Sequence, residues 1–209
     1  MVIGGAITTY LYTVHLKPRT WIKNISCAAL VAMSPITSGL ATWQVLRETS
    51  VGVGTGSIAA STSIPFGLIF HSPLTYLVLS LFAGIMSREI LMDITDCEGD
   101  ARADIQTIPV KFGKKFAANV AMACTIVSVL SACGEWMSKL TRMTSVGDIA
   151  SMAMSGSGMR KLLLSVVGSG FFAAKSYAVF RTKGDDSALA EKAVREGLLG
   201  VLLVLFSFM

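Results

Sequence analysis

REILMDITDCEGDARADIQTIPVKFG, residues 88–113, is the stretch that decides the fold and the chemistry of this chain. It gathers acidic side chains that are sparse elsewhere, because six of the 13 Asp and Glu residues lie between positions 89 and 104. Asp93, Asp96 and Asp100 are spaced so that three carboxylates share one face of a helix. Like charges at this spacing repel one another, so the face predicts a bound cation. Mg²⁺ is the expected ion, because it takes a few carboxylates and bridges to substrate phosphates.

The composition around this stretch is that of a membrane protein. Only 15% of the 209 residues are charged, 53% are hydrophobic and the mean hydropathy is +0.64. The net charge of +5 is spread over several loops, without the dense basic run of a nucleic-acid-binding protein. We therefore expect membrane lipids as partners and no nucleic acid.

The apolar runs predict an all-α, multi-helix transmembrane bundle of about six membrane segments, forming a single domain over residues 1–209. A polar, glycine-rich connection is expected at residues 44–57, followed by an apolar stretch at 58–71 that lies at the interface or enters half-way. Residues 1–15 are short for a span of about twenty residues, so they resemble the last half of a helix whose beginning is missing. The expected segments are residues 1–15, 24–43, 74–92, 116–134, 160–180 and 195–209.

The distribution of Lys and Arg predicts the topology. If residues 58–71 do not span, then residues 16–23, 88–115 and 181–195 share one face and carry twelve Lys and Arg, against five on the other face. A full span at 58–71 reduces this bias to nine against eight. The positive-inside rule favours the first arrangement, which puts the acidic stretch on the cytosol-like face.

Several kinds of protein place carboxylates at a helix end. The simplest interpretation is a solvated loop without a function. Glu89, however, lies on the same helical face as the three aspartates and at membrane depth, where ionisable residues are usually functional. An EF-hand fails on spacing, because Ile94 and Ile105 would occupy positions that need carboxylates. A CDP-alcohol phosphotransferase pattern is echoed in part, but Cys97 stands where a glycine belongs. A transporter remains a further alternative, without a visible inverted repeat.

The strongest resemblance is to the UbiA family of intramembrane prenyltransferases. Residues 88–100, REILMDITDCEGD, and residues 105–113, IQTIPVKFG, closely resemble the second aspartate-rich motif of that family. Upstream, YTVHLK at residues 12–17 is similar to the family's Y(S/T)xxLK, with Asn24 opening the next helix. The chain as a whole resembles the family's fourth to ninth helices.

The resemblance implies Mg²⁺-dependent transfer of a polyisoprenyl group from its diphosphate to an aromatic or lipid acceptor within the membrane, in quinone or prenyl-lipid biosynthesis. It implies that Asp93, Asp96 and Asp100 are catalytic and hold one Mg²⁺. Lys17 and Lys111 would face the diphosphate of the polyprenyl diphosphate, and Tyr12 would lie against the allylic cation or the metal site. The implied location is a multi-pass position in a membrane, which in a eukaryote is a plastid, mitochondrial or other endomembrane.

The family's first aspartate motif, NDxxDxxxD, occurs nowhere in the 209 residues. We therefore expect an N-terminally incomplete form of the domain that is inactive on its own. A different class of function stays open beside the enzyme: a non-catalytic membrane protein, either a pseudoenzyme or an assembly partner.

Overall fold

A computed structural model describes residues 20–51, 73–142 and 156–208 of the chain. The regular structure in these ranges is helical throughout, and they contain no strand. This confirms the prediction of an all-α multi-helix bundle. The helices are α2 (Thr20–Val51), α4 (Pro73–Arg102), the short α5 (Ile108–Phe112), α6 (Lys114–Arg142), α8 (Gly156–Arg181) and α9 (Ser187–Phe208). The predicted segments at 1–15 and 58–71 lie outside the described residues.

The long helices extend beyond the apolar runs that predicted them. The connection expected from residue 44 is wrong in its first half, because α2 continues to Val51. Residues 44–51 contain neither Gly nor Pro, so no strong helix breaker precedes Gly52. Similarly, α4 continues through Asp93, Asp96 and Asp100, which we call the acidic stripe, and ends only at Arg102. Just beyond it, Asp104 turns the chain with a positive φ of 54°.

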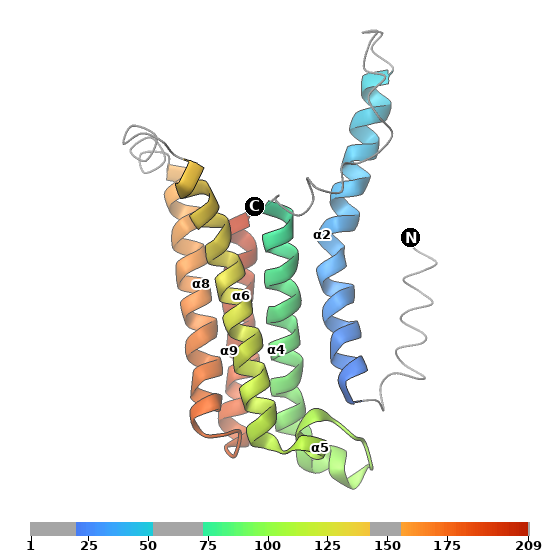
Figure 1. The fold of residues 1–209 in the computed structure, drawn as a ribbon, viewed down its shortest axis with the longest axis vertical. Coiled ribbons are helices and arrows are strands. Elements are labelled where there is room, and N and C mark those ends of the chain that lie inside the picture. Colours follow the sequence, from blue (N-terminus) through green and yellow to red (C-terminus); the bar gives the residue numbers. More distant parts are fainter. Residues whose placement is uncertain (1–19, 52–72, 143–155, 209) are drawn as a thin grey trace.

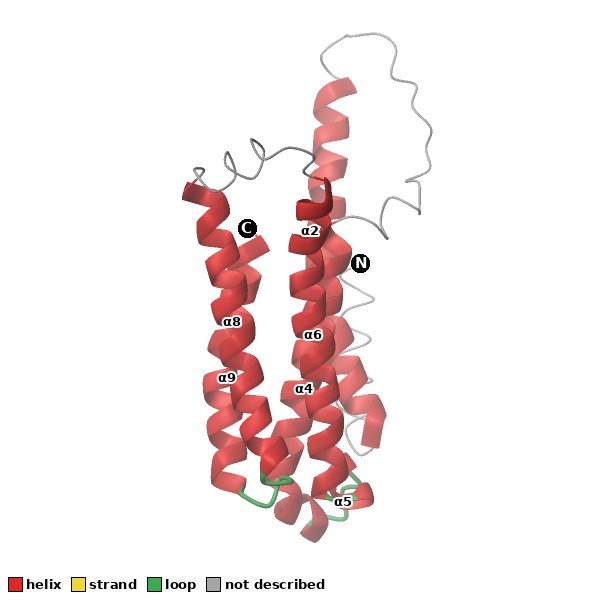
Figure 2. Ribbon diagram, turned by 60° about the vertical axis from the view of Figure 1, so that its left-hand side comes forward, coloured by secondary structure: helices red, strands yellow, loops and turns green. Residues whose placement is uncertain are grey.

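The long helices run alternately up and down (Figure 1). The lower end in this view holds Thr20, the α4–α5–α6 connection and the α8–α9 turn, and we call it the charged end. The start of α2 and the loops after α4 and α8 therefore lie together, as the distribution of Lys and Arg predicts. The α8–α9 pair packs beside the α4–α6 pair, and α2 lies at the edge against α4 (Figures 1 and 2).

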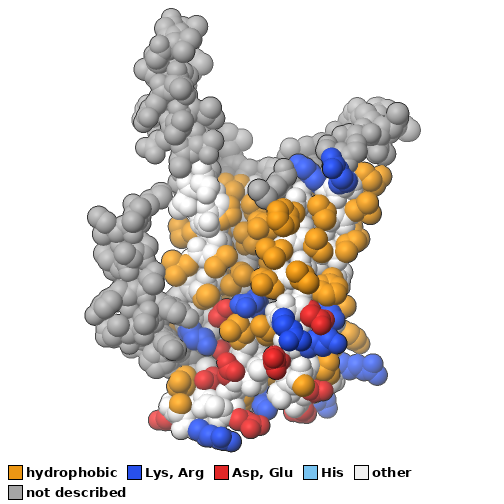
Figure 3. All heavy atoms as spheres, turned by 180° about the vertical axis from the view of Figure 1, so that it is seen from behind, with side chains coloured by type: hydrophobic (Ala, Val, Ile, Leu, Met, Phe, Trp, Pro, Cys, Tyr) orange, Lys and Arg blue, Asp and Glu red, His pale blue; other side chains and the backbone are white. Residues whose placement is uncertain are grey.

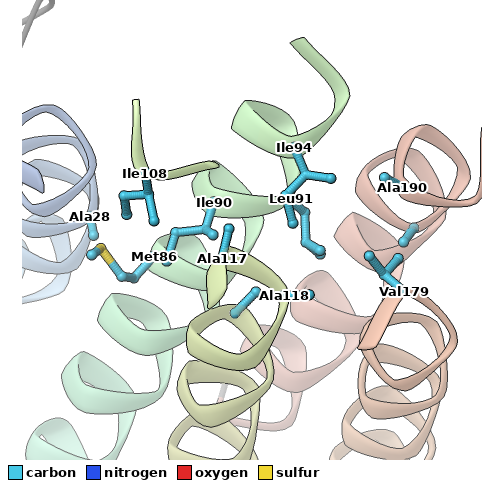
Figure 4. Close-up of a cluster of buried hydrophobic side chains, with 12 residues drawn as sticks. Ala28, Met86, Ile90, Leu91, Ile94, Ile108, Ala117, Ala118, Val179 and Ala190 are labelled. Atoms are coloured by element: carbon cyan, nitrogen blue, oxygen red, sulfur yellow. The ribbon is translucent and has the colours of Figure 1, made fainter. Parts of the chain in front are cut away.

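The main core cluster lies near the charged end, where most of the helices meet (Figure 4). Ile90, Leu91 and Ile94 on α4 and Ile108 on α5 are its largest fully buried side chains. Burying an aliphatic side chain of this size stabilises the fold by about 1.5–3 kcal/mol. Ile90 and Ile94 lie on either side of Asp93 in sequence. The packing that forms the core therefore also fixes the turn of α4 that carries Asp93.

Hydroxyl groups link the helices in the interior. The Ser87 and Thr125 hydroxyl oxygens are 2.8 Å apart, and Thr125 donates to the Ser176 hydroxyl at 2.9 Å. These contacts join α4, α6 and α8 at buried positions. Between helices surrounded by lipid the hydrophobic effect contributes little to association, so interhelical hydrogen bonds of this kind help to hold neighbouring helices together.

The outer surface of the bundle is apolar. Side chains such as Leu130, Val166 and Leu199 are more than half exposed, at 64%, 57% and 58%. Figure 3 shows hydrophobic side chains over the upper part of one face, and charged side chains of both signs towards the charged end. By length and composition, Lys114–Gly134 and Gly158–Arg181 are apolar enough to cross a membrane. Exposed apolar surface on this scale marks a contact with lipid or with another protein.

Candidate active site

The acidic stripe occupies the last three turns of α4. Asp93, Asp96 and Asp100 all lie on this helix, so the predicted helical spacing is confirmed. Their surroundings differ sharply. Asp93 is 2% exposed, whereas Asp96 is exposed and Asp100 is half-buried. The three carboxylates therefore offer different amounts of accessible oxygen to a ligand.

Asp93 is bound by two side chains from the first turn of α2. The Lys23 ammonium forms an ion pair with Oδ1 of Asp93. The Asn24 amide donates to Oδ2 of Asp93 at 2.8 Å. Both oxygens of this buried carboxylate are thus engaged. We call this arrangement of Lys23, Asn24 and Asp93 the α2–α4 clamp.

Asp96 faces the opposite neighbour. It lines an open hollow of about 170 Å³ with Met92 and Thr95 of α4 and with Glu191 and Val194 of α9. Its carboxylate is therefore reached from the side of α9, away from the α2–α4 clamp. Residues three apart on a helix differ by about 60° in direction, which is enough to separate two neighbouring helices.

Beyond Asp100 the chain folds back towards α6. The carbonyl of Asp100 accepts hydrogen bonds from the amides of Ala103 and Ile105, at 3.1 and 2.9 Å. Glu98 lies 3.9 Å from the Lys114 ammonium, but its side chain is 79% exposed, so this ion pair adds little. Burial raises the pKa of the Cys97 thiol, which keeps it neutral and poorly suited to bind a metal.

Lys111 is the predicted diphosphate residue that the structure describes. It lies exposed in α5, with its ammonium 5.5 Å from the centre of the Phe112 ring. Phe112 in turn packs with Trp21 and Phe116, at ring separations of 6.1 and 5.4 Å. The aromatic contacts bring the start of α2 to α5 and α6. Lys17 and Tyr12, the other two predicted residues, lie outside the described residues.

Comparison with known proteins identifies the family. The model of the UbiA prenyltransferase family matches residues 1–192. The chain belongs to the UbiA prenyltransferase family. The predicted resemblance to this family is thereby confirmed.

Curated relatives of this UbiA chain include several archaeal proteins that carry one name. It is 30% identical to the digeranylgeranylglyceryl phosphate synthase of Pyrococcus horikoshii over 129 residues, which are 62% of this chain and 37% of that protein. The enzyme of the same name from Pyrococcus furiosus is 32% identical over 123 residues, 59% of this chain and 35% of the relative. The matched region thus spans just over a third of these relatives.

A solved structure shares the fold. It is described as concerning "the biosynthesis of Digeranylgeranylglyceryl phosphate synthase in membranes". It matches with a TM-score of 0.67 and 19% identity, over 99% of this chain and 58% of that chain. Together with family membership, this membrane fold indicates that the UbiA chain is an integral membrane protein.

The donor set of the stripe fits Mg²⁺ in part. Among the described residues, no three His, Cys, Asp or Glu side chains are gathered as a metal cage would need. Mg²⁺ in phosphate-transfer sites, however, is usually held by one or two carboxylates, several waters and the phosphates themselves. Asp96 and Asp100, one helical turn apart with accessible oxygens, meet that requirement. Asp93 does so less well, because Lys23 and Asn24 already occupy its oxygens.

Lys23 and Asn24 are site residues that sequence reasoning missed as partners of Asp93. The sequence treats Lys23 as one of several basic residues beside the membrane and Asn24 as the start of a helix. A signal was present, since two strongly polar residues open an otherwise apolar run. Asn24 is fully buried, and its carbonyl oxygen has no hydrogen-bond partner in the described part of the chain. A buried side chain with an unpaired polar atom is uncommon in folded proteins, so its position calls for a structural reason.

Proposed function

We propose that the chain forms part of a membrane prenyltransferase that moves a polyisoprenyl group from its diphosphate to a lipid acceptor, with Mg²⁺ at the acidic stripe. Family membership supports prenyl transfer. The observation that carries the proposal is the pair of accessible carboxylates, Asp96 and Asp100, at the charged end of an apolar bundle. A diphosphate belongs at the polar end, and its isoprenoid tail belongs in the lipid.

The proposed reaction breaks the allylic C–O bond, and the electron pair leaves with the diphosphate. An acceptor oxygen then bonds to the allylic carbon and loses its proton. Mg²⁺, when bound, neutralises the charge that develops on the leaving diphosphate. Asp96 and Asp100 would hold that ion. Lys111 and Lys17 would bind phosphate oxygens, and Tyr12 would lie close to the allylic cation.

We further propose that the acceptor is a glyceryl phosphate lipid. The names of the archaeal relatives specify a glyceryl phosphate that carries two geranylgeranyl groups. Such an acceptor has a charged head and an apolar chain, which suits a site between the charged end and the exposed apolar flank of α6 and α8. An aromatic acceptor, which the sequence alone leaves equally open, is the alternative.

The proposal is tested by a transfer assay on the protein as its source encodes it, reconstituted in lipid vesicles. Labelled geranylgeranyl diphosphate is supplied with geranylgeranylglyceryl phosphate, or with homogentisate as the aromatic comparison. We expect product from the lipid acceptor only, and none after chelation of Mg²⁺. Product from homogentisate alone would show that the acceptor class is wrong.

The site assignment is tested with matched amide variants. Asp96→Asn and Asp100→Asn are each expected to lower the transfer rate about a hundredfold or more, because a neutral amide binds Mg²⁺ poorly. Glu98→Gln is the control, since Glu98 lies on the same helix but is 79% exposed and points to Lys114. Equal rates in all three variants would exclude the stripe as the reacting site.

A further inference from the structure

Asp93 is placed unlike a metal ligand. Its side chain is buried, one oxygen pairs with the Lys23 ammonium and the other accepts from the Asn24 amide. A metal ion bound to this carboxylate would lie beside the Lys23 ammonium, whose positive charge repels it and already neutralises the carboxylate. Asp96, one turn further along α4, needs no such exchange.

Among the described residues, the buried apolar side chains that hold α2 in place are small, apart from the half-buried Trp21 near its start. In the described structure it packs mainly on α4 and touches α5, at the edge of the bundle (Figure 1). Its buried apolar side chains are small, Ala28 and Ala32, whereas Ile25, Val31 and Met33 are exposed. Small side chains bury little area and make no directional contact. The α2–α4 clamp supplies a specific contact that sets the rotation and height of α2.

The clamp also lies close to the aromatic contacts around Lys111, the predicted diphosphate residue that the structure describes. Trp21, two residues before Lys23, packs against Phe112 and Phe116 at 6.1 and 6.3 Å. Phe112 is the neighbour of Lys111 in sequence. A shift of α2 would therefore disturb the aromatic contacts beside Lys111, and with them the position of Lys111 relative to Asp96 and Asp100.

We propose that Asp93, Lys23 and Asn24 are positioning residues that dock α2 on α4, and that Asp93 does not hold the metal. This inference rests on the proposed function and departs from the sequence-based expectation of three aspartate ligands. Asp96 and Asp100 then act on the metal and diphosphate, and Asp93 fixes the helix that completes the site.

The test exchanges the clamp for apolar packing. Lys23→Met and Asp93→Leu alone each leave a charged or polar partner buried without its counterpart, which is strongly destabilising. The combined variant Lys23→Met/Asn24→Leu/Asp93→Leu replaces every member with an apolar side chain of similar shape, an exchange that proteins often tolerate. We expect Asp93→Leu to lose more than tenfold in transfer rate, and the combined variant to recover at least tenfold over it. Lys23→Arg, which keeps the cation, is expected to retain transfer.

Two readouts that do not depend on turnover follow the docking of α2. One is the thermal unfolding midpoint in detergent. The other is quenching of Trp21 fluorescence by iodide, in a background with Trp43→Phe and Trp136→Phe. In the single variants we expect the unfolding midpoint to fall and the quenching of Trp21 to increase. In the combined variant both should return towards the parent values. Asp96→Asn is the contrasting control, since it should change neither readout while losing transfer.

A combined variant with the parent midpoint and parent quenching, but with no more transfer than Asp96→Asn, would overturn the inference and make Asp93 a ligand. If the combined variant does not fold, the exchanged pair Lys23→Asp/Asp93→Lys decides instead. Transfer at least tenfold above Asp96→Asn supports positioning, and transfer at its level overturns it. Full transfer by Asp96→Asn would contradict the proposed function but not the docking of α2, because the unfolding midpoint and the Trp21 quenching still report on the clamp.

Discussion

Asp93 and Asp96 are three residues apart on one helix, yet one is 2% exposed and the other faces an open hollow beside α9. The difference follows from helix geometry, since the two side chains leave α4 towards different neighbours. Two like charges that are close in sequence therefore differ in the folded chain. Asp93 is buried and paired with the Lys23 ammonium, whereas Asp96 is exposed. Burial without Lys23 would be too costly for Asp93 to remain ionised.

Thr125 provides a test of the interior at the same scale. Its hydroxyl is shared between Ser87 on α4 and Ser176 on α8. Thr125→Val keeps the shape and removes the hydroxyl, so we expect the free energy of unfolding to fall by about 0.6–2 kcal/mol. Ser131→Ala is the control, because among the described residues the Ser131 hydroxyl donates to the carbonyl of Val127 on its own helix and not to another helix. Equal effects of the two substitutions, measured by denaturation in detergent, would refute the interhelical role.

The sequence was sufficient to find the acidic stripe but not its partners. The spacing of Asp93, Asp96 and Asp100 is local, and a helix turns it into a shared face without reference to the rest of the chain. The partner of Asp93 is 70 residues away in sequence, on a helix whose register against α4 depends on packing. The sequence around residue 93 therefore does not indicate that Asp93 pairs with Lys23 whereas Asp96 stays accessible.

At the scale of elements, apolar runs locate each described long helix but misplace its ends. Hydropathy marks only the part of a helix in lipid, whereas helical backbone continues until Gly, Pro or a positive φ interrupts it. α2 therefore runs to Val51, and α4 runs ten residues beyond the apolar run that ends at Met92. The close packing of α8 on α9 also escapes sequence reasoning, because it depends on which of several glycines face one another.

Gly168 and Gly200 are those facing glycines. A Cβ on either would lie 2.7 Å from the backbone carbonyl oxygen of the other, a distance that side chains do not adopt. We expect Gly200→Ala to lower the free energy of unfolding by about 1–3 kcal/mol, because α8 and α9 must move apart. Gly170→Ala is the matched control on α8, where an added Cβ meets nothing within 4 Å. Thermal unfolding would contradict the account if the two alanines had the same effect.

At the scale of the molecule, the bias of Lys and Arg gives the right arrangement of helix ends. The bias is summed over all loops, so an error of a few residues at one helix boundary does not change its sign. The described structure places the end of α4 and the end of α8 together at the charged end, and the start of α8 at the opposite end (Figure 1). The solved structure with a TM-score of 0.67 shares this fold.

This topology predicts a labelling pattern. In a background without Cys27, Cys97, Cys124 and Cys133, single cysteines at the exposed positions Arg102 and Arg181 should react with an impermeant maleimide from the same face of sealed vesicles. Met159→Cys, near the start of α8, should react only from the other face. Reaction of Arg102→Cys and Arg181→Cys from opposite faces would contradict the bundle.

The most direct test of the central claim is binding of a non-hydrolysable geranylgeranyl thiodiphosphate to the protein as its source encodes it, measured by calorimetry with and without Mg²⁺. We expect saturable binding that requires Mg²⁺ and is lost in the Asp96→Asn/Asp100→Asn double variant, while the variant unfolds at the parent temperature. Binding that is equally tight without Mg²⁺, or in the double variant, would contradict the assignment of the acidic stripe as the metal–diphosphate site.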